Sequence, residues 1–240
     1  MSRTLIISDV HANAPALEAV LAAEPDRDSV VFLGDAVDNG PHPNAVCNRL
    51  RDLDVAASVV GNHDRTVLDA SESGDSDDPF ARWQAWTRDR LSDENRAFLE
   101  SLDRTATVAP ASRSLRLHHG DFPPPENHEG EWPTRVTPDD DAPMFEVVAA
   151  RYDEDVILHG HSHYPFETTV AGTTFVNPGS VGLQREDWPA NHARYATLED
   201  GAFDLRAVPY DTSAVTTDSR RLNSPFVEIW NRPVPSAESD

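Results

Sequence analysis

The first 60 residues alternate short apolar runs with amphipathic segments, and this alternation narrows the folds open to the chain. The runs Thr4–Ser8, Ser29–Leu33 and Val55–Val60 are typical of buried strands. A first helix is expected after Asn13, whose side chain can cap it, and a second at Asn44–Leu53. Strands that alternate with helices in this way predict a parallel sheet with right-handed crossovers.

The second half of the chain is richer in strand patterns. Strands are expected at Ser114–His119, Asp155–Leu158, Phe166–Val170, Thr173–Val176, Ala193–Leu198 and Phe203–Val208. Helical patterns occur at Phe80–Leu102, with a break near Ser92, and at Met144–Arg151. We therefore expect a second sheet packed on the first, that is, an α/β fold in which a two-sheet β-sandwich is flanked by helices.

Two segments rich in polar residues are expected to be loops, and the chain end has no clear pattern. Asp69–Asp78 is dominated by acidic and small residues, and Asp121–Asp141 by Pro, Glu and Asp. Residues from about Ser213 onward show no clear periodicity. The expected organisation is one domain over residues 1–210, followed by a partly irregular C-terminal tail over residues 211–240.

Acidic residues outnumber basic residues by 42 to 20, which gives a net charge of −22, and every basic residue is arginine. The acidic residues are spread along the sequence, which favours a solvated surface over a binding face for one cationic partner. This composition resembles that of proteins from salt-loving microbes, and it predicts a fold that requires high salt. Such a charge also repels polyanions, so we expect no stable binding of nucleic acids.

The compartment is indicated by cysteine content and by the start of the sequence. The single cysteine, Cys47, excludes an internal disulfide framework and is typical of a reducing compartment. The first residues lack the apolar core of a signal peptide, and no apolar stretch approaches the roughly 20 residues of a membrane helix. The expectation is a cytoplasmic protein without a membrane partner.

Five short polar motifs each follow an expected strand. They are Asp9-Val10-His11, Gly34-Asp35 with Asp38 beyond it, Gly61-Asn62-His63-Asp64, His119-Gly120 and Gly160-His161-Ser162-His163. Each motif alone is weak, because such residues are common in turns. The carboxyl ends of parallel strands meet at one edge of a sheet, however, so the motifs can converge there. A set of carboxylates, imidazoles and an amide favours Mn, Fe, Zn, Co or Ni.

In type, order and spacing, these five motifs resemble those of the calcineurin-like metallophosphoesterases. That family's pattern runs Asp-x-His, Gly-Asp-x-x-Asp, Gly-Asn-His-Asp/Glu, His and Gly-His-x-His, and all five blocks occur between Asp9 and His163. The stretches Gly40-Pro41-His42-Pro43-Asn44 and Asn177-Pro178-Gly179-Ser180-Val181-Gly182 are similar to those of a small archaeal and bacterial phosphodiesterase branch. The resemblance extends over about residues 3 to 210.

The resemblance implies a site with two divalent metal ions, manganese being expected and Fe, Ni, Co or Zn the alternatives. One ion would be held by Asp9, His11 and His163, the other by Asn62, His119 and His161, with Asp35 as the bridge. His63 would act on the leaving group as an acid or charge stabiliser, oriented by Asp64. A hydroxide bridging the two metals would then attack the phosphorus atom in line.

Several neighbouring residues leave alternatives open. His118 could replace His119 as the ligand, although strand parity and the position before Gly120 favour His119. Asp38 could orient a ligand or merely cap a turn. Arg65 and Arg185 could contact a phosphate oxygen or be structural. His159 is expected to be packed in the core.

The function predicted from this pattern is hydrolysis of a small phosphate ester, with a phosphodiester, including a nucleotide, as the expected substrate. The alternatives are a phosphomonoesterase, a dinucleoside polyphosphate hydrolase and a protein phosphatase; the chain has neither the long insertions nor the basic groove that would favour the last. A non-catalytic scaffold of the same fold is a remote alternative, because every ligand position and His63 are present.

Overall fold

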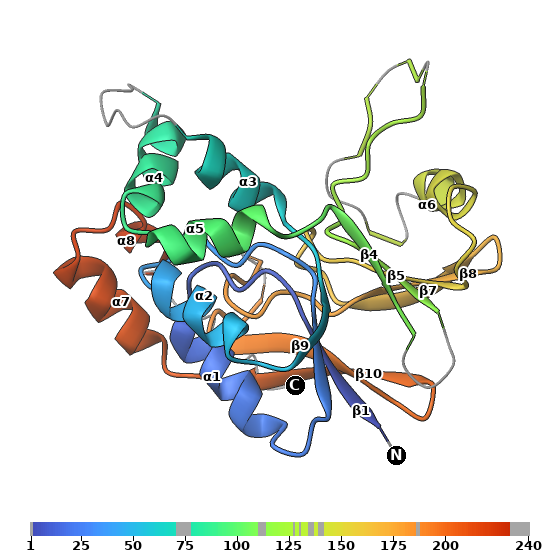
Figure 1. The fold of residues 1–240 in the computed structure, drawn as a ribbon, viewed down its shortest axis with the longest axis horizontal. Helices are drawn as coiled ribbons and strands as arrows, with labels where there is room; N and C mark the ends of the chain where they lie inside the picture. Colours follow the sequence, from blue (N-terminus) through green and yellow to red (C-terminus); the bar gives the residue numbers. More distant parts are fainter. Residues whose placement is uncertain are drawn as a thin grey trace.

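The computed structural model describes residues 2–70, 78–109, 114–126, 128–129, 131–133, 137–138, 142–185 and 188–230. Over these residues the strands form two five-stranded sheets, with helices around them (Figure 1). The predicted two-sheet α/β sandwich is confirmed.

The first sheet has the strand order β10-β9-β1-β2-β3. Its strands are β1 (Arg3–Ile7), β2 (Ser29–Phe32), β3 (Val55–Ser58), β9 (His192–Glu199) and β10 (Ala202–Pro209). Strands β1, β2 and β3 are parallel, as the crossovers through α1 (Ala14–Ala23) and α2 (Pro43–Arg51) require. Strands β9 and β10 form a hairpin that adds antiparallel to β1.

The second sheet has the order β4-β5-β6-β8-β7. Its strands are β4 (Thr105–Val108), β5 (Leu115–His118), β6 (Val156–Leu158), β7 (Phe166–Val170) and β8 (Thr173–Asn177). The central strands β5, β6 and β8 are parallel, and the two edge strands pair antiparallel. Strand β4 was missed by the sequence patterns, because Thr105-Ala106-Thr107-Val108 is short and only half-buried.

Alternate residues of the central strands pack into different cores, since side chains alternate across a strand. Ile6 of β1 faces the core between the sheets, whereas Leu5 and Ile7 pack against the helices that cover the first sheet. On the second sheet Ile157 packs outward under α6 (Ala142–Ala149), and Val156 and Leu158 pack inward. The result is a layered arrangement of helices, sheet, sheet and helix.

The predicted helical stretch at Phe80–Leu102 is divided where the sequence indicated. Helix α3 (Asn62–Asp69) is followed by α4 (Pro79–Arg88) and α5 (Asp93–Glu100). The Ser92 hydroxyl accepts a hydrogen bond from the Asn95 amide and so caps α5. The acidic loop predicted at Asp69–Asp78 falls largely outside the described residues, and no helix or strand occurs among those described between 121 and 138.

The C-terminal region is more ordered than its sequence suggested. Residues from about Ser213 onward showed no clear pattern and were expected to form a partly irregular tail, but α7 (Thr212–Arg221) and α8 (Val227–Trp230) follow β10. Helix α7 was overlooked because threonines, serines and arginines dominate its sequence and leave no clear apolar periodicity. Its one fully buried apolar side chain is that of Val215. Phe226 is also fully buried, with its ring centroid 5.4 Å from that of Trp83 on α4. Residues 231–240 lie outside the described part.

Replacing Phe226 with alanine is expected to lower the free energy of unfolding by about 3–5 kcal/mol, because the substitution leaves a cavity beneath α4. Urea unfolding of Phe226→Ala and of the parent chain would measure the loss. The exposed Phe80, 64% accessible, provides the matched control. Phe80→Ala should change the stability by less than about 1 kcal/mol, and equal losses in the two variants would contradict the packing of the C-terminal region on α4.

Within the described part of the chain, none of the helices combines the length and apolar character that a membrane crossing requires.

Candidate metal centre

The five polar motifs converge from both sheets onto one place. Loops after β1, β2 and β3 bring Asp9, Asp35 and Asn62 from the first sheet, and loops after β5 and β6 bring His119 and His161 from the second. Backbone hydrogen bonds fix these loops to one another: Asp9 N donates to Gly34 O at 2.9 Å, and Gly160 N donates to His119 O at 2.7 Å. Across the seam, the His161 N–H donates to Asp9 Oδ2 at 3.1 Å, which ties the loops of the two sheets together.

The backbone at this seam is strained. Positive φ angles are found at Asp9 (54°), His11 (48°), Asp35 (57°), His161 (69°) and His163 (58°). Non-glycine residues rarely adopt this left-handed region, and such residues concentrate at functional sites. Five of the seven predicted ligands have this conformation. It turns their side chains toward a common point at the expense of local backbone energy.

Two glycines allow the loops to approach so closely. A Cβ at Gly61 would collide with the carboxylate of Asp35, and a Cβ at Gly160 would collide with the hydroxyl of Ser8. The glycines of the motifs are therefore required by close packing around the site.

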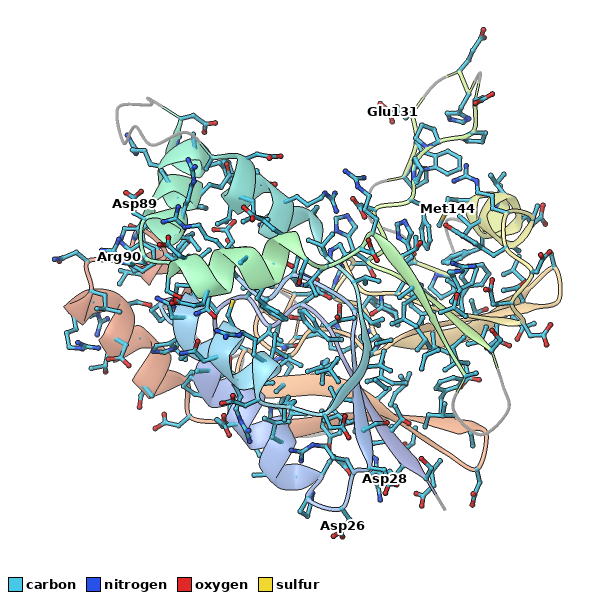
Figure 2. All side chains as sticks on the ribbon, viewed as in Figure 1. Asp26, Asp28, Asp89, Arg90, Glu131 and Met144 are labelled. Carbon is cyan, nitrogen blue, oxygen red and sulfur yellow. The ribbon has the colours of Figure 1, made fainter. Side chains whose placement is uncertain are left out.

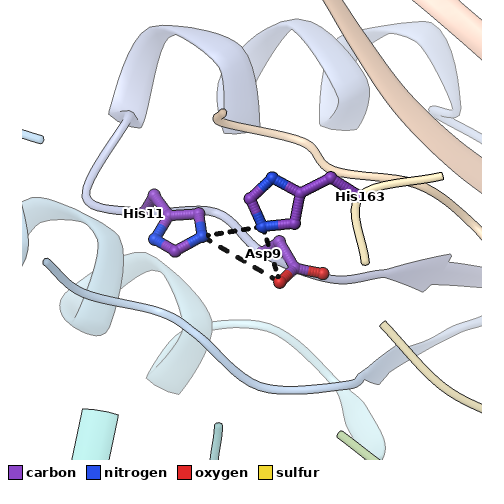
Figure 3. A group of neighbouring side chains, drawn as sticks. All are labelled: Asp9, His11 and His163. Atoms are coloured by element: carbon purple, nitrogen blue, oxygen red, sulfur yellow. Dashed lines mark hydrogen bonds and ion pairs between the residues drawn. The ribbon is translucent and has the colours of Figure 1, made fainter. Parts of the chain in front are cut away.

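Asp9, His11 and His163 form one group whose ligand atoms could hold a metal ion (Figure 3). The His163 Nε2 atom lies 3.2 Å from Asp9 Oδ1 and 3.2 Å from His11 Nε2. The His11 Nε2 atom is 3.9 Å from Asp9 Oδ1, and Asn39 Nδ2 lies 3.2 Å from the other ring nitrogen of His11. This is the trio predicted for the first metal, and Asn39 orients one of its rings.

Asp9, Asp35 and His119 form a second such group, so Asp9 belongs to both. The His119 Nε2 atom lies 3.1 Å from Asp35 Oδ2 and 3.0 Å from Asn62 Oδ1. Its Nδ1 atom is 2.8 Å from the carbonyl oxygen of Leu33, which orients the ring. The ring centroid of His161 is 5.2 Å from that of His119. All the predicted ligands of the second metal thus lie around one point.

Asp35 belongs to the second group, and its carboxylate also approaches His11 of the first. Its Oδ2 atom is 3.1 Å from His119 Nε2 and 3.9 Å from His11 Nε2, while its Oδ1 accepts the backbone N–H of His63 at 2.8 Å. The Oδ2 atom is buried and makes no hydrogen bond apart from its ion-pair contact with His119 Nε2. A buried carboxylate is costly unless a cation compensates it. The residues therefore fit two divalent cations close to Asp35.

Ionised carboxylates and imidazoles lie in direct contact where the groups meet. Burial alone would raise the pKa of Asp9 and Asp35, but the adjacent imidazoles hold both pKa values well below the usual range. Burial lowers the pKa of His11 to about 3, which leaves a neutral imidazole. For His119, the Asp35 carboxylate overcomes burial and raises the pKa to about 10. A cation between these two side chains would take the place of that proton.

His63 is oriented by Asp38 and not, as predicted, by Asp64. The His63 Nδ1 atom lies 2.7 Å from Asp38 Oδ2. The Asp64 carboxylate instead accepts the backbone N–H groups of Asp35, Val37 and Gly61 at 2.9, 3.0 and 3.1 Å. Adjacent residues on a helix point about 100° apart, so Asp64 in the first turn of α3 faces the backbone behind it.

Asp38→Asn is expected to lower kcat by about 10- to 100-fold while both metal ions stay bound, because only the orientation and charge of His63 change. Burial lowers the pKa of His63, but Asp35 and Asp38 raise it to about 9. A protonated His63 loses its proton as pH rises, so removing the Asp38 charge should move the alkaline limb of the pH–rate profile to lower pH. An alkaline limb at the same pH in Asp38→Asn and in the parent chain would contradict the role of the Asp38–His63 pair.

Asp64→Asn is the matched contrast. Its amide cannot accept three backbone N–H groups as a carboxylate does, so it should lower the free energy of unfolding by about 1–3 kcal/mol. The two variants therefore separate catalysis from folding.

The remaining candidates lie around the site in different roles. His118 points away from the metal groups: its ring stacks on Phe122 at 4.4 Å, and its Nδ1 accepts the Gly120 N–H. His159 is fully buried, and burial lowers its pKa to about 3. Arg65 forms an ion pair with Asp121. Arg185 lies 5.6 Å from the ring of Tyr164 and donates to Ser162 O at 3.4 Å.

The model of the calcineurin-like phosphoesterase superfamily domain matches residues 3–200. The chain belongs to this superfamily. The family predicted from the five motifs is confirmed, and two groups of Asp and His side chains could each hold a metal ion, as is typical of this family.

Relatives of this chain match most of its length. An uncharacterised protein of Methanocaldococcus jannaschii, MJ0912, is 32% identical over 228 residues, with 86% of each chain covered. The serine/threonine-protein phosphatase 2 of Escherichia coli is 24% identical, with 75% of this chain and 88% of that protein covered. The crystal structure of a metallophosphoesterase from Sphaerobacter thermophilus is 28% identical, has a TM-score of 0.77, and covers 95% of this chain and 98% of its own.

Proposed function

We propose that this phosphoesterase hydrolyses small phosphodiesters with two bound divalent metal ions. The observation that supports this most is the pair of adjacent ligand groups, with the buried Oδ2 of Asp35 3.1 Å from His119 Nε2 in one and 3.9 Å from His11 Nε2 in the other. Asp9, His11 and His163 would hold one ion, and Asn62, His119 and His161 the other, with Asp35 shared. Manganese is the proposed metal, since carboxylate, amide and imidazole ligands without a thiolate suit it.

When bound, the ions supply charge to polarise the phosphate and to activate water. The residues of the chain do the rest. Asp35 holds both halves of the site at one spacing and fixes the backbone of His63. His63, whose side chain is 32% exposed and lies at the rim, would face the leaving group and donate a proton to its oxygen. Asp38 keeps that imidazole oriented and protonated.

The proposal is tested by assaying one panel of esters with Mn, Ni, Co, Mg and Zn in molar salt. The panel contains phosphomonoesters, linear and cyclic phosphodiesters, dinucleoside polyphosphates and a phosphoserine peptide. Faster turnover of diesters than of monoesters, lost on chelation and restored by Mn, is expected. A preference for the phosphopeptide would instead favour a protein phosphatase, the activity named for the Escherichia coli relative. No turnover of any ester would refute the proposal.

We also propose that the fold depends on high salt. The net charge of −22 is self-repelling, and salt screens that repulsion. Unfolding curves in low and in molar potassium chloride should show a higher midpoint in the second. Equal midpoints would contradict the proposal.

A further inference from the structure

An apolar cavity of about 450 Å³ opens beside the metal centre. Its walls come from one loop, namely Phe122, Pro123, Pro124, Trp132 and Pro133. Two of the proposed metal ligands, Asn62 and His161, complete the lining together with Asp121. The cavity therefore lies where a group attached to a phosphate at the metal centre could be bound.

The wall of this cavity is built in advance. The Trp132 indole N–H donates to the Phe122 carbonyl oxygen at 2.7 Å, and Arg151 donates to the Pro123 carbonyl oxygen at 2.7 Å. Phe122 stacks on His118 with ring centroids 4.4 Å apart. The loop that includes Glu131 projects beyond the sheets (Figure 2). A wall held in this way loses little entropy when a ligand enters.

The residues that line the cavity indicate which kind of chemical group it would bind. Rigid aromatic and proline side chains present flat apolar surfaces, on which planar rings stack well. The one carboxylate among the lining residues, Asp121, is paired with Arg65. The volume suits one nucleoside-sized group and excludes a folded peptide or an oligonucleotide.

We propose that the cavity receives the nucleobase of a nucleotide substrate, stacked against Trp132, while the phosphate of that substrate lies at the metal centre. This inference deepens the proposed function and rests on it for the position of the phosphate.

The test compares two probes that differ only in the base. Isothermal titration of the manganese-loaded protein with AMP and with ribose 5-phosphate gives two dissociation constants, and released phosphate is measured after each titration. AMP should bind at least about ten-fold more tightly, since a stacked base contributes about that much or more. Trp132→Ala should reduce the affinity for AMP to that for ribose 5-phosphate and leave the latter unchanged. Trp132→Phe retains a flat ring and should keep most of the difference.

Equal affinities of the parent chain for AMP and ribose 5-phosphate would overturn the inference, as would a difference that survives Trp132→Ala. The outcome is separable from that of the ester panel. Turnover of diesters without any effect of the base would refute the cavity assignment and keep the proposed function. A base effect that depends on Trp132, in a protein that hydrolyses no ester, would refute the proposed function and support the cavity.

Discussion

Asp35→Asn is expected to abolish tight binding of both metal ions, with a loss of affinity greater than about 100-fold. Changes to residues that only support a ligand already cost roughly 10- to 100-fold, and Asp35 would contact both ions directly. Asparagine keeps the size of the side chain and can still accept the His63 N–H, so the fold should persist. What disappears is the negative charge that offsets the repulsion between two cations.

Elemental analysis and metal titration measure the effect, and two variants serve as controls. His163→Ala removes one ligand from one group and should weaken mainly one ion. Asp218→Asn, on α7, removes the same charge from a surface ion pair with His42 and should leave both ions bound. Two ions and near-normal turnover in Asp35→Asn would show that the arrangement of the whole site is wrong.

His63→Ala is expected to retain both metal ions and to lose about 10²- to 10⁴-fold in kcat, the range typical of a positioned acid or charge stabiliser. The imidazole is not a member of either ligand group, and it lies beside them, with its ring centroid 5.0 Å from that of His11. The leaving group should set the size of the loss. An alkoxide requires protonation, whereas p-nitrophenolate leaves without it, so the defect should be larger for alkyl esters.

The comparison of alkyl and p-nitrophenyl esters therefore reports on proton donation specifically. A uniform defect for both esters would point to a general structural effect of the substitution. Loss of metal from His63→Ala, seen by elemental analysis, would mean that His63 is a ligand and that the assignment fails.

The layered fold and the positions of the site residues could largely be predicted from the sequence. Period-two patterns and buried runs identified nine of the ten strands in the described part of the chain; β4 was missed because Thr105-Ala106-Thr107-Val108 contains no apolar run. Helix α7 could not be predicted, because its sequence is mostly polar and only Val215 and Ser219 are buried. An apolar face this narrow does not stand out in a sequence.

The convergence of the five motifs could be predicted because each follows a strand, and the carboxyl ends of parallel strands meet at one edge of a sheet. The partner of His63 could not be predicted in this way. Asp64 is adjacent in sequence, whereas Asp38 approaches from another loop, in a positive-φ conformation (71°) that no sequence pattern announces. The cavity beside the site was missed for a similar reason. Trp132 lies in a segment whose Pro and acidic residues indicated only a loop. Its position in the cavity wall depends on tertiary contacts that the sequence does not show.

The two sheets contribute separate halves of the proposed ligand set, Asp9, His11, Asp35 and Asn62 from one and His119, His161 and His163 from the other. Ions bound between them would join the layers of the sandwich as a cross-link that exists only in the folded chain. Binding and folding would then be thermodynamically linked, and a free metal concentration 100 times the dissociation constant would add about 2.7 kcal/mol to the stability for each ion. The melting temperature of this protein would accordingly follow the metal content of its surroundings, and a chelator would act on it as a mild denaturant.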